Sequence, residues 1–235
     1  MGDPQTSGFG GEEMRQDPLK YALCYNLAME EKIKAIKSWL GTGSINIFGL
    51  PMSGKDTQGI RLAEVLGGKF LSSGLIIRAM EQSSKKSYSE NGSLIPTNVF
   101  YEWVLPYFER KDLFKYPLIL SSVGRWHGEE NAVMTAAASA GHNVKAVILL
   151  NISEQDAISR FEVAKTLNDR GDRPDDKNIE VFKNRLDEFR SKTMPVITFY
   201  NELGLLINVN GDQPRDAVFK EILEKLYEKS LQFPA

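Results

Sequence analysis

The sequence contains one cysteine, Cys24, in 235 residues. A single cysteine can form neither an intrachain disulfide nor a cysteine-based zinc site, which fits a reducing cytoplasm, where we expect the protein to be located. The sequence also lacks an apolar run of the roughly 18–20 residues that a membrane-spanning helix needs. Its first residues do not combine a basic segment with a following apolar segment, as a secretory signal does. These absences argue against a disulfide-rich secreted protein and against a membrane protein.

An excess of charge of either sign is also missing. The chain has 29 lysines and arginines against 31 aspartates and glutamates, for a net charge of −2. A chain with this balance has no overall field that would attract nucleic acid or a membrane surface, so we expect neither as a partner. An anionic ligand would have to be held by a local group of lysine and arginine side chains.

The first 43 residues differ in pattern from the rest. Residues 1–16 are rich in glycine and polar residues, and we expect them to be disordered. From Asp17 to about Leu40 the pattern becomes helical, and Pro18 suits a first helical turn. We therefore interpret residues 1–43 as an extension whose helix packs on the main domain, on a protein partner or on a second copy of the chain. The apolar stripe of this helix consists of Met29, Ile33, Ile36 and Leu40.

Residues 44–235 alternate short apolar segments with helical patterns. Residues 144–150 (VKAVILL) are nearly all apolar, as expected for a strand covered on both faces. The alternation predicts a parallel sheet with right-handed crossovers, and hence a three-layer α/β/α domain with five strands. The predicted strands are 45–48, 69–72, 118–121, 144–151 and 205–209. The helical patterns are at 54–66, 97–110, 128–140, 153–168, 176–202 and 214–230.

The clearest motif follows the first predicted strand. The segment GLPMSGKDT runs from strand to helix with the spacing GxxxxGK, which predicts a P-loop NTPase fold. Gly49 and Gly54 permit a tight loop whose amide groups turn inward, and the next helix adds its positive N-terminal end. Lys55 can reach the β- and γ-phosphates of a nucleotide. Asp56 stands where a serine or threonine usually helps to hold Mg²⁺, and Thr57 follows it.

Several further segments, in order, resemble the adenylate kinase family of nucleoside monophosphate kinases. GLPMSGKDTQ is similar to the family's GxPGxGKGTQ, and SSGLIIR at 72–78 is similar to STGDLLR. LSSVGR at 120–125 lies where the family has LDGFPR, and RPDD at 173–176 resembles RxDD. The segments RL at 185–186 and TMPVITFY at 193–200 resemble the family's RL and TxPVIxYY. The resemblance covers roughly residues 44–230.

This resemblance implies an enzyme that transfers the γ-phosphoryl group of ATP to a nucleoside monophosphate, with AMP as the first expected acceptor and Mg²⁺ as the cofactor. It implies a helical acceptor-binding insertion and a short zinc-free lid around residues 160–176, which moves and excludes water. The family's second lid arginine falls on Ala164, so Lys165 or Arg170 is a candidate for a further lid charge.

Transfer of a phosphoryl group needs dense positive charge, and arginine can bind phosphate oxygens through two parallel hydrogen bonds. By resemblance, the residues around the transferring group are Lys55, Arg125, Arg160, Arg173 and Arg185. The implied ATP-binding residues are Gly49, Pro51, Met52, Ser53, Gly54, Lys55, Asp56, Thr57 and Gln213. The implied acceptor-binding residues are Ser73, Arg78, Leu94, Ile95, Arg125 and Glu129.

The sequence departs from the family mainly in the acceptor half. Leu75, Ser121 and Thr97 stand where the family has acids, and Glu129 stands where it has the glutamine that reads adenine. An ionised carboxylate only accepts hydrogen bonds, and guanine offers adjacent N1–H and N2–H₂ donors, so Glu129 would suit GMP better than AMP. Alternatively, Glu129 points to solvent or pairs with a basic residue such as Arg125.

The acid that is missing at Ser121 has a counterpart at Asp56. Mg²⁺ prefers oxygen ligands and usually keeps several waters, so we expect Asp56, with Thr57, to take part in binding the metal, partly through water. The alternative is an aspartate that only caps the start of a helix.

Two other functions stay open. The chain could be a kinase for GMP, UMP, CMP or a deoxynucleotide, or a nucleotide-binding module with weak catalysis that docks a partner through its N-terminal helix. A general ATPase is less favoured, because the acceptor-side arginines would then have no role.

Overall fold

The computed structural model describes residues 18–89, 91–167 and 176–232, and these residues contain a five-stranded, all-parallel sheet with the strand order β2-β3-β1-β4-β5. Three strands match the predicted ranges, and the first and last differ from them by one residue at each end. The predicted fold class is therefore confirmed. The strands are β1 (Ser44–Gly49), β2 (Lys69–Ser72), β3 (Leu118–Ser121), β4 (Val144–Asn151) and β5 (Leu206–Asn210).

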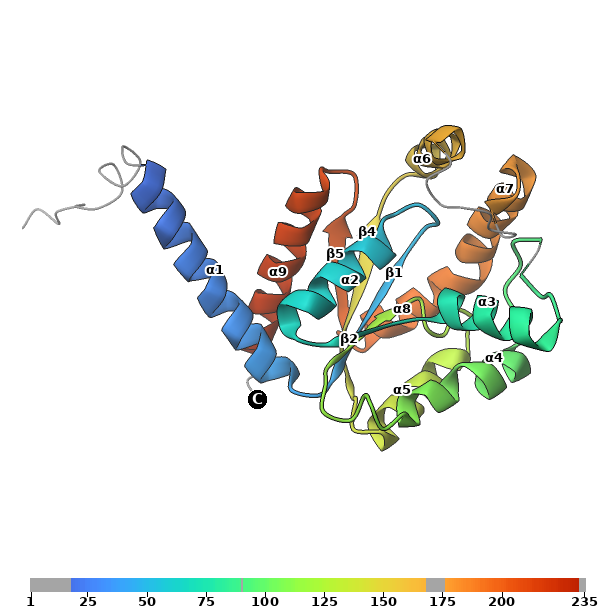
Figure 1. Cartoon of the computed structure of the whole chain (residues 1–235), viewed down its shortest axis with the longest axis horizontal. Coiled ribbons are helices and arrows are strands. Elements are labelled where there is room, and N and C mark those ends of the chain that lie inside the picture. Colours follow the sequence, from blue (N-terminus) through green and yellow to red (C-terminus); the bar gives the residue numbers. More distant parts are fainter. Residues whose placement is uncertain (1–17, 90, 168–175, 233–235) are drawn as a thin grey trace, which may run out of the picture.

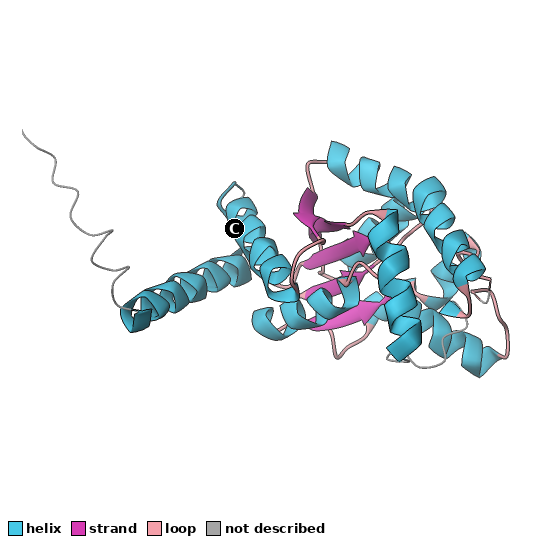
Figure 2. Ribbon diagram, turned by 90° about the horizontal axis from the view of Figure 1, so that it is seen from above, coloured by secondary structure: helices cyan, strands magenta, loops and turns pink. Residues whose placement is uncertain are grey.

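Helices cover both faces of this sheet (Figures 1 and 2). The helices are α1 (Pro18–Leu40), α2 (Lys55–Leu66), α3 (Ser73–Ser84), α4 (Thr97–Trp103), the 3₁₀ helix η2 (Leu105–Glu109), α5 (Glu129–Ser139), α6 (Glu154–Leu167), α7 (Ile179–Glu188), the π-helical segment η4 (Phe189–Thr193), α8 (Met194–Glu202) and α9 (Arg215–Gln232).

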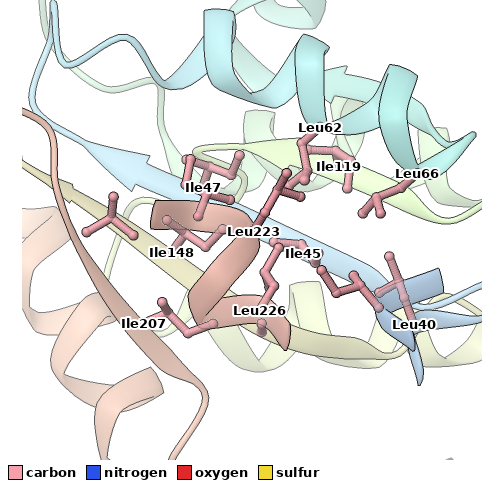
Figure 3. Close-up of a cluster of buried hydrophobic side chains, with 14 of the residues drawn as sticks. Leu40, Ile45, Ile47, Leu62, Leu66, Ile119, Ile148, Ile207, Leu223 and Leu226 are labelled. Atoms are coloured by element: carbon pink, nitrogen blue, oxygen red, sulfur yellow. The ribbon is translucent and has the colours of Figure 1, made fainter. Parts of the chain in front are cut away.

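Side-chain alternation along the strands separates two buried faces. In β4, Ile148 packs with α1, α2 and α9 on one face, while Val147 and Leu149 pack with α6, α7 and α8 on the other. Figure 3 shows the first of these clusters, in which Ile45 and Ile47 of β1 meet Leu223 and Leu226 of α9. A third cluster joins β2 and β3 to α3, α4 and α5. Burial on both faces explains why the central strands are almost wholly apolar.

The helix of the N-terminal extension packs on the main domain. Met29, Ile33, Ile36 and Leu40, the predicted apolar stripe, all join the cluster on the face covered by α2 and α9, and Ile36 is completely buried. Close to this contact, Lys32 forms an ion pair of 3.1 Å with Glu224 of α9. For the described residues, this confirms the first of the three alternatives, in which the apolar stripe packs on the main domain.

The structure differs from the predicted helices in three places. The sequence reading missed α3, because Gly74 and the flanking serines hide a short helix that begins directly after β2. The pattern at 97–110 is interrupted before η2, where Pro106 cannot donate a backbone hydrogen bond. The pattern at 176–202 contains η4, in which the chain widens before Pro195 and Met194 N–H bonds to the carbonyl of Phe189.

Two expectations fall on residues outside the described ranges, namely disorder of residues 1–16 and the lid tip around Arg170 and Arg173. Among the helices that are described, none has both the length and the apolar character required to cross a bilayer.

Candidate active site

The glycine-rich loop joins β1 to α2 with the geometry that its sequence predicts. Gly49 has no room for a side chain, because a Cβ there would be 2.5 Å from Ser53 Oγ and 2.9 Å from the carbonyl oxygen of Leu150 in β4. Gly54, the N-cap of α2, has a φ of 86°, which glycine adopts without the steric cost of a side chain. Lys55 then begins the helix, with Nζ 3.5 Å from the carbonyl oxygen of Leu50. The loop and the helix start therefore present amide groups and a lysine to the same region.

Met52 is the unusual member of this loop. It has a φ of 68°, in the left-handed region that costs residues with a Cβ of the order of 1–2 kcal/mol. The resembling family motif has glycine at this position. Ser122, the residue after β3, is a second non-glycine residue with positive φ, at 51°, and Lys85, outside the cleft described next, is a third, at 56°. Met52 and Ser122 both line that cleft.

A cleft extends from the glycine-rich loop to the segments around α3 and α4. Four cationic side chains reach it from separate elements: Lys55 of α2, Arg78 of α3, Arg125 after β3 and Arg185 of α7. Of the predicted residues it also contains Pro51, Met52, Asp56, Ser73, Leu94, Ile95 and Glu129.

A second pocket lies on the other side of the loop and shares Met52 with the first. Arg160 of α6 lines it and donates hydrogen bonds to the carbonyl oxygens of Met52, at 3.4 Å, and Gly211, at 3.1 Å. Gln213 lines it as well, with its amide donating to the Asn210 carbonyl oxygen and to Glu221. The other predicted residues in this pocket are Ser53, Gly54 and Thr57.

The predicted residues therefore divide between two adjoining pockets. Arg160 lies in the second pocket, apart from the four cations of the first, and Arg173 lies outside the described residues. Asp56 and Thr57, predicted together as metal ligands, line different pockets. Arg185 forms a largely buried ion pair with Asp176, the last residue of the RPDD motif.

Asp56 and Ser121 are in direct contact. The Ser121 hydroxyl, at the end of β3, donates a hydrogen bond of 2.5 Å to Asp56 Oδ1. Both side chains line the cleft, and β1 and β3 are paired in register, which brings the start of α2 next to the end of β3. The carboxylate at Asp56 thus lies beside the position where the resembling family carries its acid. Within the described ranges, no three histidine, cysteine or acidic side chains lie together as a metal-binding group.

Glu129 is buried, with 2% of its surface exposed, so the expectation that it points to solvent was wrong. Its carboxylate accepts hydrogen bonds from the backbone N–H groups of Arg125 and Trp126 and from the hydroxyl of Thr97. Burial raises the pKa of Glu129, although these three hydrogen bonds and the charge of Arg125 act in the opposite direction.

Sequence reasoning missed several residues of the acceptor half. Trp126 and Phe100 line the cleft, and Lys192 Nζ lies 4.0 Å from the centre of the Trp126 ring. Buried Asn46 of β1 holds the segment after β3 by accepting from Val123 N–H and donating to its carbonyl oxygen. The only sequence signals for these residues were an aromatic residue directly after a predicted phosphate ligand and a polar residue in an apolar strand.

Comparison with known proteins agrees with the resemblance. A family model described as "Adenylate kinase" matches residues 47–205. The chain is 34% identical over 188 residues to an adenylate kinase of Methylobacterium nodulans, covering 76% of this chain and 93% of that protein. It is 32% identical over 190 residues to an adenylate kinase of Agrobacterium fabrum, covering 77% and 96%.

Among solved structures, a gluconokinase from Sinorhizobium meliloti 1021 is similar with a TM-score of 0.54 and 17% sequence identity. The match covers 81% of this chain and 94% of that one. At this identity the similarity concerns the fold alone.

Proposed function

The chain belongs to the adenylate kinase family, and we propose that it transfers the γ-phosphoryl group of ATP to a nucleoside monophosphate, with AMP as the first candidate acceptor. The observation that carries the proposal is the single cleft that Lys55, Arg78, Arg125 and Arg185 reach from four separate elements. Such a cleft can hold the phosphate groups of two ligands, because four cations offset the charge that their oxygens bring together.

We assign roles to individual residues from the family resemblance, supported by the pocket that each residue lines. The glycine-rich loop and Lys55 bind the β- and γ-phosphates of ATP, and Arg160 and Gln213 belong to the ATP side of the loop. Arg78 and Arg125 bind the phosphate of the acceptor, while Arg185 stabilises charge on the transferring group. Ser73, Leu94 and Ile95 line the acceptor part of the cleft. The lid around residues 160–176, with Arg173, stays a prediction.

Mg²⁺ fits two oxygen donors that line the cleft. The Asp56 carboxylate and the Ser121 hydroxyl are hard oxygen donors in contact with each other, and they would hold the ion partly through water. When bound, Mg²⁺ neutralises phosphate charge and orients the two reacting groups. We also propose that the enzyme acts in the cytoplasm, and the support for this is the single cysteine.

The proposal is tested by incubating the full chain with ATP and Mg²⁺ and a panel of AMP, GMP, UMP, CMP and deoxynucleoside monophosphates, with ADP formation as the readout. Turnover with AMP above all others is the expected result. Preference for another monophosphate would keep the reaction class and change the acceptor. Tight ATP binding with no ADP from any acceptor would favour a nucleotide-binding module instead.

A further inference from the structure

Two adjacent buried carboxylates begin helix α5, and they hold different parts of the preceding segment. Glu129 Oε2 accepts hydrogen bonds from Arg125 N–H at 2.8 Å and Trp126 N–H at 3.0 Å. Glu130 Oε2 accepts from Gly128 N–H at 2.6 Å, and its other oxygen lies 3.1 Å from His127 Nδ1. Only Glu129 therefore bonds the backbone that carries the cleft-lining side chains of Arg125 and Trp126.

Glu129 also reaches across the cleft wall to a separate element. Its Oε1 accepts a hydrogen bond of 3.0 Å from Thr97, the first residue of α4, and Phe100 of the same helix lines the cleft. One carboxylate of α5 thus joins the segment after β3 to the start of α4. A second anchor lies upstream, where Asn46 holds Val123, so the backbone of Arg125 is fixed from two directions.

We propose that Glu129 is a positioning residue for Arg125. By bonding the backbone of Arg125 and Trp126 and the hydroxyl of Thr97, it sets where the Arg125 guanidinium meets the phosphate of the monophosphate. This inference rests on the proposed function. Removal of the carboxylate leaves two backbone N–H groups and one hydroxyl without their acceptor. Without these hydrogen bonds, the segment after β3 no longer holds the Arg125 side chain in one position.

Glutamine at position 129 separates positioning from direct recognition of the base. Its amide oxygen can accept from both backbone N–H groups, and its NH₂ can donate to the Thr97 oxygen, which is able to accept. Glu129→Gln therefore keeps the three contacts. It changes the hydrogen-bonding character that a base would meet, so direct recognition predicts an altered preference among monophosphates.

The kinetic test compares Glu129→Ala, Glu129→Gln and the matched control Glu130→Ala, which removes the neighbouring buried carboxylate. Glu129→Ala should raise KM for the preferred monophosphate by about tenfold or more, as loss of bonds to a charged acceptor would, and leave KM for ATP within about twofold. Glu129→Gln should stay within about threefold of wild type with unchanged preference, and Glu130→Ala within about twofold for both substrates. Equal rises in both KM values for Glu129→Ala, or a changed preference for Glu129→Gln, would overturn the proposal.

Amide hydrogen exchange gives a readout that does not depend on turnover. In Glu129→Ala the amides of Arg125 and Trp126 should exchange about tenfold faster or more, while amides of β1 and β4 should keep the wild-type rate. In Glu130→Ala the amides of Arg125 and Trp126 should stay protected. If wild type phosphorylates no monophosphate, the proposed function fails, but exchange still decides the positioning role. Unchanged exchange at both amides in Glu129→Ala would refute it.

Thr97→Val provides a second variant if Glu129→Ala does not fold, because it removes only the Oε1 partner. It should raise KM for the monophosphate by about threefold or more, because one of the three hydrogen bonds that the carboxylate accepts is lost, without affecting KM for ATP. An acceptor KM equal to that of wild type in a folded Thr97→Val protein would contradict the link from α4 to Arg125.

Discussion

Lys55 lies at the start of a helix and also lines the cleft. It follows Gly54, so its Cα lies at the start of α2, and its side chain lines the cleft beside Asp56. The Lys55→Ala variant should have a turnover number about 10²–10³ times lower than that of wild type, because it lacks the preorganised charge at the phosphates. Far-UV circular dichroism should be unchanged. Lys34→Ala, an exposed change on α1, provides a control that should keep wild-type turnover. Near-native turnover of folded Lys55→Ala would exclude the proposed role of the loop.

The contact between Asp56 and Ser121 leads to a prediction about metal dependence. In Asp56→Gly the carboxylate is lost, and the Mg²⁺ concentration for half-maximal turnover should rise by about tenfold, or about 1.4 kcal/mol of binding. Adding Ser121→Asp to this variant should partly restore the wild-type requirement, because Ser121 lies within hydrogen-bond distance of the lost carboxylate. A magnesium titration of the three proteins checks this. If Asp56→Gly needs no more Mg²⁺ than wild type, Asp56 does not bind the metal and only caps the start of α2.

The buried carboxyl of Glu129 predicts a pH dependence of stability. Burial, the largest effect, raises its folded pKa above the unfolded value. Its contribution to the free energy of unfolding is then fully present below the unfolded pKa and is lost as the pH rises through the folded pKa. Wild type should therefore lose stability relative to Glu129→Gln as the pH rises above the pKa of an unperturbed glutamate, which is about 4.3. Urea unfolding at several pH values measures the difference, and a difference that grows in favour of wild type with rising pH would contradict the assignment.

At the level of secondary structure, α1 contributes to the core of a domain that begins after it. Ile36 is completely buried against α9, whereas Leu27 on the same helix is 53% exposed. Ile36→Ala should lower the free energy of unfolding by about 2–5 kcal/mol, the range for a large aliphatic residue truncated in a core. Leu27→Ala should change it by less than about 0.5 kcal/mol. Thermal and urea unfolding distinguish the two.

The same packing bears on truncation. Removing residues 1–40 would expose Ile222, Leu223 and Leu226 of α9, which pack with Ile36 in one cluster. We expect this truncated chain to melt at a lower temperature, and removal of residues 1–16 alone to leave the melting temperature unchanged. An unaltered melting temperature and oligomer size after removal of residues 1–40 would show that the α1–α9 contact contributes little.

At the scale of the whole molecule, α7 links the acceptor region to the other side of the cleft. Asn184 donates hydrogen bonds to the carbonyl oxygen of Asn91 and to the hydroxyl of Ser93, and the next residue, Arg185, lines the cleft. Glu188, one turn later, accepts from Leu94 N–H at 3.0 Å. The segment that we expect to contact the acceptor is thus held by the helix that carries Arg185, for which we propose a role in phosphoryl transfer.

Asn184→Ala should therefore weaken monophosphate binding by about threefold to tenfold, which matches the loss of one or two hydrogen bonds. Its affinity for ATP should not change. Calorimetric titration of each nucleotide measures both affinities, with Asn131→Ala, an exposed change on α5, as the control. Equal losses for both nucleotides would place the effect in the fold rather than in the acceptor region.

Features that depend on neighbours in the chain were readable from the sequence. The glycine-rich loop could be predicted because Gly49, Gly54 and Lys55 act through local backbone geometry and their distance along the chain. The strands and the stripe of α1 could be predicted because hydrophobic periodicity is a local pattern. Family resemblance added the arginines, and Arg78, Arg125 and Arg185 do line one cleft.

Contacts between distant residues could not be read in this way. Asp56 meets Ser121 across 65 residues because β3 pairs with β1, and Thr97 meets Glu129 across 32 because α4 and α5 share a core cluster. A sequence lists these four residues as separate departures from a motif. In the folded chain they form two hydrogen-bonded pairs, each with a carboxylate acceptor and a hydroxyl donor. The reason is physical: hydrogen bonds act over about 3 Å, and only the packed chain determines which side chains come that close.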